Sequence, residues 1–600
     1  MLNPRAWDPR FTPDLSPFVD RLAALFSSLS ESGVTSAATL QRRLLATGIQ
    51  PDDFRLQQTW KGLDEWGDRP IDLEAFRQLI SAELLMVTRV LNHQLIVPEW
   101  EEFQRDIRFL YDQVASDRSG ANADYIPILR DADPERWGVA VCTVDGQRLA
   151  LGDVDDYHSI QSVSKPITYA FALAQEGAEF THQFVGVEPS GRPFNALELL
   201  PDMRPYNPCV NAGAIMIAGL VASGFPDRES RGITQELIEL WADLCGHGSP
   251  VRFSEETMLS ERATADNNFA IAYLLQGRHG LPRGVDLHKM LDVYFSCCSI
   301  EMTARMLSVA AATLANGGVC PISGRPVLST DIVKRTLSVM QSAGMYDSAG
   351  SFTLEVGLPA KSGVAGSVLV VIPNLMGFAT FSPRLDSYGN SVRGVSFCRQ
   401  LVERFSVHVY DNLSGGHSGC KRDPRVSRKQ RKQADLSDLR WGISHGDRSA
   451  LRVRDLILAC LIDISLADGE LESQEIEVMN RIYAELIGEP PAQGALEKLA
   501  QQRSSEPAAQ VAKPVDGARA GSGSAFDRLL LELSAQSGQI DDQAREIILE
   551  TAFQVACSDG TLENEEQEKL RAIARALGIG EGVLELEINA FQRARQSQLA

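Results

Sequence analysis

The sequence predicts an α+β fold for the central part of the chain, flanked by helical regions on both sides. Two apolar strand pairs, within 138–151 and 367–381, enclose a long region of helical periodicity from Pro166 to about Asn316. Helical spacing of apolar residues also dominates the stretches before and after them. A sheet built from the two ends of a domain, with helices inserted between them, is an α+β arrangement.

The first hundred residues carry the pattern of packed helices. Apolar residues recur at helical spacing from about Phe18 to Phe109. The segment 64–76 resembles a calcium-binding loop, but it lacks the regular ligand spacing and the glutamate at the twelfth position that such a loop uses. We therefore expect residues 1–112 to form a helical, EF-hand-like N-terminal domain without calcium ligands.

Two hairpins define the expected sheet of the central domain. Gly138–Val144 and Arg148–Leu151 are joined by the turn residues Asp145 and Gly146, which favour a tight connection between antiparallel strands. Ser367–Ile372 and Gly377–Phe381 form the second pair, around a Pro-Asn turn. We expect this catalytic domain to span residues 113–413, with the helical lobe inserted between its hairpins.

A basic run from Lys421 to Lys432 follows the central domain. Such runs are typical of solvated linkers or docking segments, and the acidity of the rest of the chain disfavours RNA binding here. We expect a basic linker at 414–450 and a helical domain at 451–600. The Pro-, Ala-, Gly- and Ser-rich tract 503–524 within it is predicted to be a disordered insert.

The C-terminal region repeats the pattern Asp-Gly-x-Leu-Glu-x-x-Glu, starting at Asp468 and at Asp559. With this repeat it resembles the TerB-like helical domains of tellurite-resistance proteins. One interpretation is a divalent-cation site, built from Asp468, Glu472, Glu475, Asp559, Glu563 and Glu566. The other, which we favour, is that Asp-Gly forms a turn and the acids stabilise the N-terminus of the next helix. We therefore predict no metal.

Composition narrows the function classes. The formal net charge of -21 argues against nucleic-acid binding as the main role, because phosphate neutralisation needs concentrated Lys and Arg. The start of the chain has no apolar segment of the secretory type, and the apolar stretch 212–225 is shorter than the ~20 residues that span a bilayer. Ten scattered cysteines without a C-x-x-C pair suggest reduced core thiols. We expect a cytoplasmic protein without a membrane partner.

The chemistry is indicated first by Ser162 and Lys165. Residues three apart share a helix face, so the lysine can reach the serine hydroxyl and take its proton without a histidine. A Ser-x-x-Lys pair alone is weak evidence, but this one stands after a strand pair and before an apolar helix. Pro166 suits a first helical turn, whose free N–H groups could stabilise an oxyanion.

A second motif, Lys361-Ser362-Gly363, leads into a strand as the K-T-G element does in penicillin-recognising serine enzymes. Small residues up to Gly366 let a backbone approach a bound acyl group closely. The S-D-N element of those enzymes is absent. Its absence disfavours a penicillin-binding or β-lactamase activity.

From about Phe18 to Leu413 the chain resembles the serine-dependent glutaminases, whose fold is β-lactamase-like. The resemblance rests on ordered matches at Ala123–Pro127, Gln161–Pro166, Asn207–Ala214, Ser260–Arg262, Asn267–Ala270, Tyr294–Glu301, Gly344–Asp347 and Gly357–Gly366. It implies a β-lactamase/transpeptidase-like sheet with an inserted helical lobe. It also implies hydrolysis of L-glutamine to L-glutamate and ammonia without a cofactor.

The resemblance implies roles for individual residues. Ser162 would attack the side-chain amide with Lys165 as its base, Tyr346 would relay the proton to ammonia, and the N–H groups of Ser162 and Val364 would form the oxyanion hole. The substrate would be held by Tyr125, Gln161, Asn211, Glu261, Asn268 and Tyr294. The family also implies a homo-oligomer, a dimer or tetramer and in some cases a filament.

Each binding residue also has an ordinary structural explanation. Tyr294 could be a core residue, Asn211 a helix cap, and Glu261 with Asn268 a solvated polar face. The ordered set of matches favours the functional interpretation.

The segment 192–200 corresponds to the loop that gates activity in the animal enzymes, and activation by phosphate does not follow from it. The remaining alternative is a catalytically relic scaffold, whose TerB-like tail binds a partner or a metal in a stress response.

Overall fold

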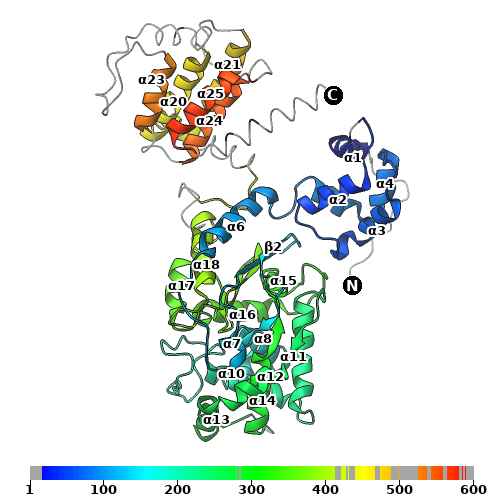
Figure 1. Ribbon diagram of the computed structural model, residues 1–600, viewed down its shortest axis with the longest axis vertical. Coiled ribbons are helices and arrows are strands. Elements are labelled where there is room, and N and C mark those ends of the chain that lie inside the picture. The colour runs from blue at the N-terminus through cyan, green and yellow to red at the C-terminus, as the bar shows by residue number, and fades with distance from the viewer. Residues whose placement is uncertain are drawn as a thin grey trace, which may run out of the picture. The chain divides into compact units, whose positions relative to one another are not determined.

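The computed structural model describes residues 16–30, 32–278, 280–282, 285–411, 421–427, 430, 439–465, 473–487, 498, 525–536, 542–557, 562, 564–579, 584 and 588 (Figure 1). It divides into two compact units. One comprises Met1–Ser414 with Lys421–Arg425, and the other comprises Gly415–Cys420 with Val426–Ala600.

The first unit begins with a small helical bundle around its own core. The pairing of Thr35 with Ile71 by two backbone hydrogen bonds joins the loops that precede two of its helices. Ser36 and Asp72 follow those residues and cap the two helices, because their side chains accept from backbone N–H groups of the first turn. The elements are α1 Ser16–Leu29, α2 Ala37–Ala46, η1 Phe54–Leu56, α3 Gln57–Trp66, α4 Leu73–Ile80, η2 Ser81–Glu83 and α5 Leu84–Leu91.

Helix α6, Trp100–Ala115, packs with the central sheet rather than with this bundle. Its buried residues, including Phe103, Ile107 and Leu110, belong to the same apolar cluster as β-strand residues and helix α18, Val392–Arg404. The helix lies inside the range expected for the N-terminal domain, 1–112. The boundary expected at residue 112 stays a prediction.

The central sheet has five antiparallel strands in the order β2-β1-β8-β7-β6. Every residue of β1, β7 and β8 is buried, so helices cover both faces. Alternate side chains point to opposite faces: Val139, Val141 and Phe378 face the cluster with α6 and α18, and Ala140, Cys142 and Ala379 face the other. The strands are β1 Gly138–Thr143, β2 Arg148–Gly152, β6 Ala360–Ser362, β7 Ser367–Ile372 and β8 Met376–Phe381.

On the second face, helix α15, Ala304–Ala315, approaches β8 closely. A Cβ on Gly377 would lie 2.2 Å from the backbone nitrogen of Ala312, so only glycine fits between strand and helix. Helix α10, Asn211–Ser223, is buried from Asn211 to Ala222. The long apolar stretch that contains it is thus the central helix of the lobe.

The helical lobe between the two hairpins also holds a three-stranded sheet, in the order β3-β5-β4. The predicted α+β fold, with a helical lobe inserted between the strand pairs, is confirmed. The remaining elements of this unit are α7 Pro127–Arg130, β3 His158–Ser159, η3 Gln161–Val163, α8 Ser164–Glu176, α9 Ala178–Thr181, α11 Ser230–Leu244, β4 Arg252–Phe253, α12 Glu255–Ala263, α13 Asp266–Arg278, α14 Leu287–Cys298, β5 Ile300–Met302, α16 Thr330–Ala343, η4 Tyr346–Ser348 and α17 Ala349–Glu355.

The start of the basic run contacts the first unit. The guanidinium of Arg422 forms ion pairs with Glu102 and Asp106 of α6 and lies over the ring of Phe405. Lys421 pairs with Asp411 at 3.1 Å. At least these two residues of the expected linker are therefore held by intramolecular charge pairs.

The second unit is helical. Its described helices enclose an apolar cluster that includes Ile457, Leu461, Leu533, Ile548 and Ile573. The predicted disordered insert 503–524 lies outside the described residues, as do the side chains of Asp468, Glu472, Glu475, Asp559 and Glu563. The helices are α20 Arg448–Ser465, α21 Ser473–Ile487, α23 Ala525–Gln536, α24 Asp542–Ala556 and α25 Asn564–Leu577.

Two further properties hold for the described part of the chain. None of its helices has the length and apolar character that crossing a bilayer requires. Its cysteines are unpaired and, apart from the half-buried Cys557, buried. These positions are those of core residues, and the reduced state of the thiols stays a prediction.

Candidate active site

Ser162 lies in a tight turn between strand β3 and helix α8. The Ile160 N–H donates to Ile300 O at 2.8 Å, which continues the pairing of β3 with β5 up to the turn. Gln161 then has φ of 49°, a left-handed conformation that is costly for a residue with a side chain. The strained turn places Ser162, which is 7% exposed, at the start of α8.

Lys165 lies on the first turn of α8 and is only 2% exposed. Its Nζ donates to Asn211 Oδ1 at 2.6 Å and to Cys209 O at 3.4 Å, rather than to the Ser162 hydroxyl. Burial lowers the pKa of Lys165 to about 8, because desolvation penalises the charged ammonium. A minor fraction of this amine is therefore neutral near physiological pH, and the neutral form is the one that can act as a general base.

Asn211 and Asn268 extend this contact across the lobe. Asn211 begins α10, and its Nδ2 donates to Asn268 Oδ1 on α13 at 3.0 Å. Its backbone N–H donates to Phe194 O at 2.8 Å, which fixes the preceding loop to the site. The side chain thus presents its oxygen to Lys165 and its amide nitrogen to Asn268.

Glu261 forms the centre of a second group. Its Oε1 accepts from Tyr125 Oη at 2.8 Å and from Gln161 Nε2 at 2.9 Å. The residue is 7% exposed, and burial raises the pKa of its carboxyl, opposed by the two hydrogen bonds and the nearby Lys165. Oε2 takes part in neither of these two bonds, so it remains open to a cationic group.

Tyr346 lies opposite the nucleophile turn. Its φ is 52°, and its ring packs on Phe194 at a centroid distance of 4.7 Å. Burial raises the pKa of Tyr346, and the neighbouring Ser162 hydroxyl opposes this rise. The two hydroxyls do not meet the geometry of a hydrogen bond, which leaves the buried Tyr346 Oη unpaired.

The turn between β6 and β7 presses against the nucleophile turn. A Cβ on Gly363 would lie 2.7 Å from Ile160 O, so glycine is required for this approach. Gly363 N–H donates to Ser367 O and Gly366 N–H to Gly363 O, each at 2.9 Å. Neither bond uses the N–H of Val364, the expected oxyanion donor.

Tyr294 lies on α14 and is 6% exposed. Burial raises its pKa, and the thiol of Cys298 and the charge of Glu261 add to the rise. The structure therefore brings together all ten residues singled out from the sequence. They form the pairs and triads Lys165 with Asn211 and Asn268, Glu261 with Tyr125 and Gln161, and Ser162 with Tyr346, with Val364 and Tyr294 adjoining.

Sequence reasoning assigned no role to three further residues of the site. Phe194 contacts Tyr346 and lies 5.8 Å from the Lys165 ammonium, measured to its ring centroid. Lys361 is fully buried beside Tyr346, and the Cys298 thiol lies among Lys165, Glu261 and Tyr294. The Lys-Ser-Gly motif and the loop 192–200 indicated the first two regions, but not these contacts.

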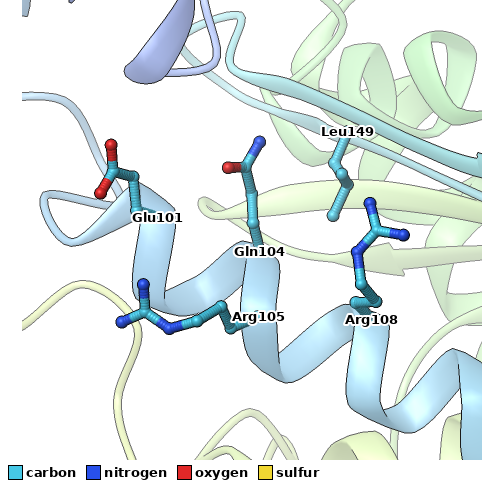
Figure 2. A pocket seen from close by; sticks show the side chains of 5 residues that line it. All are labelled: Glu101, Gln104, Arg105, Arg108 and Leu149. Carbon is cyan, nitrogen blue, oxygen red and sulfur yellow. The ribbon is translucent and has the colours of Figure 1, made fainter. Parts of the chain in front are cut away.

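Two surface hollows lie elsewhere in this unit. One, of about 360 Å³, lies between α6 and β2, where Glu101, Gln104, Arg105 and Arg108 extend from the helix beside Leu149 (Figure 2). The other, of about 350 Å³, is lined by Tyr169, His182, Val187, Lys334, Arg335, Ser338, Val339 and Ser342. None of the ten site residues lines either hollow.

Comparison with known proteins agrees with this geometry. A family model described as glutaminase matches residues 120–410, the range that contains the whole site. The chain is 40% identical over 414 residues to the mitochondrial liver isoform of glutaminase from Mus musculus, covering 68% of each chain. This chain belongs to the glutaminase family. The predictions of an enzyme, and of a glutaminase in particular, are confirmed.

Two other matches cover smaller shares of the chain. It is 42% identical over 382 residues to putative glutaminase 3 of Caenorhabditis elegans, which covers 62% of this chain and 65% of that protein. A solved structure described as a probable glutaminase has 37% identity and a TM-score of 0.47, and covers 50% of this chain and 97% of that one.

Family models also match the two flanks of the chain. An EF-hand domain model matches residues 19–98, and a model of tellurite resistance protein TerB matches residues 457–586. The predicted resemblance of the tail to TerB is confirmed. Absence of calcium ligands from the N-terminal domain stays a prediction.

Proposed function

We propose that the chain hydrolyses the side-chain amide of L-glutamine to L-glutamate and ammonia through a glutamyl ester on Ser162. The observation that carries this proposal is the buried Lys165, whose pKa is lowered to about 8, one turn after a serine that faces the unpaired hydroxyl of Tyr346. A serine beside an amine base and a proton-relaying phenol has the parts needed for acyl transfer.

In acylation, Lys165 takes the Ser162 proton as Oγ bonds to the amide carbon. The oxyanion accepts hydrogen bonds from the N–H groups of Ser162 and Val364, whose turns the Gly363 contact holds together. Tyr346 gives its proton to the nitrogen as the C–N bond breaks, and regains a proton from Lys165. Ammonia leaves, and the glutamyl ester remains.

In deacylation, water attacks the ester carbon through the same groups. The neutral amine of Lys165, with Tyr346 as relay, takes a proton from the water, and the C–O bond to Ser162 breaks. That proton returns to the serine oxygen, so glutamate is released and the site is restored. Every step of this scheme uses groups of the chain itself.

Glutamine would be held by its α-amino and α-carboxylate groups. Glu261, buried and with Oε2 outside its two hydrogen bonds to Tyr125 and Gln161, is placed to pair with the α-ammonium. The amides of Asn211 and Asn268 and the phenols of Tyr125 and Tyr294 can donate to the α-carboxylate. A substrate without the α-ammonium would leave the Glu261 charge unpaired in a buried site, so it would bind poorly.

The alternative of a relic catalytic domain is disfavoured by the site itself. Buried ionisable groups and left-handed residues at Gln161 and Tyr346 destabilise a fold, and function is the usual reason for retaining them.

We further propose that the protein acts as a homo-oligomer in the cytoplasm and binds neither nucleic acids nor membranes. Its TerB-like tail would then serve a separate contact.

The deciding experiment is ammonia release from L-glutamine by the purified full-length protein and by Ser162→Ala. We expect turnover in the wild type and a loss of at least ~10³-fold in the variant, because the nucleophile is removed. Ser223→Ala, which removes a hydroxyl bonded to Leu220 O at the end of α10, is the matched control and should keep full activity. Hydrolysis of a chromogenic cephalosporin in place of glutamine would instead favour a β-lactamase, and activity retained in Ser162→Ala would rule out the serine mechanism.

A further inference from the structure

Lys361 is a buried amine to which the proposed mechanism gives no step. It lies on β6 with no exposed surface, and it is one of the largest fully buried side chains of the described chain. Its Nζ donates to Gly344 O at 3.0 Å and to Ser362 O at 2.7 Å. Burying an amine is costly, so a lysine retained at this depth beside an active site indicates a role.

One of these two hydrogen bonds, to Gly344 O, reaches the backbone segment that carries Tyr346. Gly344 precedes Tyr346 by two residues, and its carbonyl also accepts the Ser362 N–H at 3.2 Å. A Cβ on Gly344 would lie 1.7 Å from Ala360 O, so this segment is pressed directly against β6. Lys361 thus fastens the residues before Tyr346 to the strand that leads into the oxyanion turn.

Tyr346 needs such support because its backbone is strained. Its φ of 52° lies in the left-handed region, which is unfavourable for a residue with a side chain. The Lys361 Nζ also lies 4.3 Å from the centroid of the Tyr346 ring, within the range of a cation–π contact. Phe194 contacts the same ring. Lys361 and Phe194 therefore both help to set the orientation of the ring.

The surroundings of Lys361 fit a donor that stays in place. Burial lowers its pKa to about 7, the like charge of Lys165 adds to this, and the thiols of Cys209 and Cys298 oppose it. An amine donates hydrogen bonds in either protonation state. The two bonds to carbonyl oxygens therefore persist across neutral pH.

We propose that Lys361 is a positioning residue for Tyr346: it holds the Gly344 segment against β6 and supports the ring, so that the phenol hydroxyl faces Ser162. This inference rests on the proposed function, which gives the hydroxyl of Tyr346 its part in proton transfer. Lys361 touches neither substrate nor reacting atoms in this account. Its effect on the reaction passes through Tyr346.

The first test replaces Lys361 by methionine in the full-length protein. We expect kcat for glutamine to fall at least tenfold while KM changes less than twofold, because proton transfer is impaired and the binding groups are untouched. Removing a desolvated amine should leave the unfolding midpoint equal or higher. Lys289→Met is the matched control, since Lys289 also donates to two backbone oxygens, Phe225 O at 2.9 Å and Pro226 O at 3.3 Å, away from Tyr346. It should keep the wild-type kcat.

The second test is a double-mutant cycle with Tyr346→Phe, which keeps the ring and removes the hydroxyl. If Lys361 acts through that hydroxyl, Lys361→Met should lower kcat less than twofold in the Tyr346→Phe background. A tenfold loss in that background, or a wild-type kcat in Lys361→Met, would overturn the inference. Lys361→Gln, which keeps a donor for Gly344 O, takes the place of methionine if the first variant does not fold.

If the proposed glutamine hydrolysis itself is wrong, the experiments give a different set of results. A wild-type protein that releases no ammonia from glutamine contradicts the proposed reaction, whatever Lys361 does. A Tyr346→Phe variant with the wild-type kcat would show that the hydroxyl takes no part in the mechanism, and this result would also contradict the inference about Lys361. An active wild type, an impaired Tyr346→Phe and an unimpaired Lys361→Met would contradict the inference alone.

Discussion

The ammonium nitrogen of Lys165 lies 2.6 Å from Oδ1 of Asn211. This contact joins the first turn of α8 to the first residue of α10, and Asn211 is itself tied to Asn268 on α13. A neutral amide stabilises the buried ammonium less than a carboxylate would. The choice of asparagine therefore keeps the pKa of Lys165 low, which suits a base that must lose its proton near neutrality.

We predict that kcat/KM of the wild type rises with pH through about 8, because the neutral form of Lys165 is the base and burial lowers its pKa to that value. Asn211→Asp places a carboxylate against the ammonium, so the pKa of Lys165 should rise and the ascending limb should move up by at least one pH unit. The measurement is kcat/KM for glutamine from pH 6 to 10. Asn211 is also a proposed substrate ligand, so its replacement can lower kcat/KM at every pH. The test therefore depends on the pH at which the ascending limb lies and not on the maximal value of kcat/KM. If the ascending limb did not move, the ionisation seen in the pH profile would not be that of Lys165.

The ring contact between Phe194 and Tyr346 makes a loop residue part of the site. Phe194→Ala removes a surface that holds the Tyr346 ring, so we predict a fall in kcat of about tenfold with the same unfolding midpoint, in keeping with the cost of small misplacements at active sites. Leu197→Ala, on the same loop but 51% exposed, is the control and should be neutral. Equal effects of the two substitutions would show that the loop acts by its general order and not by this contact.

Gly363 makes the closest approach between the nucleophile turn and the oxyanion turn. A Cβ there would lie 2.7 Å from Ile160 O, so Gly363→Ala must move one turn away from the other. We predict a loss of kcat of ~10²-fold, the size expected when one oxyanion donor is misplaced. Gly350→Ala, where a Cβ meets nothing within 4 Å, should keep the wild-type rate. If Gly363→Ala were fully active, the N–H groups of these two turns would not be the oxyanion donors.

Sequence patterns predicted the features that depend on local spacing. The Asp145-Gly146 hairpin and the helical lobe are both set by residues close in sequence, and Ser162 lies in the short turn just before the helix that carries Lys165. The resemblance to a family then indicated which distant polar residues should meet. The structure places Asn211 in contact with Asn268, and Glu261 in contact with Tyr125. Their roles in substrate binding stay a prediction.

Contacts made by backbone atoms and by aromatic rings were beyond prediction from the sequence. The partners of Lys361 are two carbonyl oxygens, which no side-chain motif specifies. The strand β3 has only two residues and is defined by its pairing with β5, more than a hundred residues away. Left-handed backbone at Gln161 and Tyr346 is likewise a consequence of tertiary packing, because neither residue type favours it locally.

His158 offers a prediction for stability rather than rate. Its Nδ1–H donates to Asp156 O at 3.0 Å, and its Nε2 accepts from the hydroxyl of Ser367, at the start of β7. The ring stacks on Phe381 with a centroid distance of 3.9 Å, and burial lowers the pKa of His158 to about 4. The imidazole is therefore neutral in the folded protein at pH values where the unfolded chain, with an ordinary pKa near 6.5, already binds a proton.

Because the pKa is lower in the folded state, the stabilising contribution is complete above about pH 6.5 and is lost as the pH falls towards 4. Over that window the linkage amounts to about 3 kcal/mol at most. We predict that the thermal unfolding midpoint of the first unit falls more steeply between pH 7 and 4.5 in the wild type than in His158→Phe, which keeps the stacking on Phe381 without the ionisable ring. Differential scanning calorimetry of the two full-length proteins measures this difference. Other titratable groups contribute equally to both curves, so their contribution cancels when the midpoint of the variant is subtracted from that of the wild type at each pH. Parallel curves would mean that the folded protein accommodates the protonated imidazole, so that His158 and Ser367 do not link the nucleophile segment to β7 in a pH-dependent way.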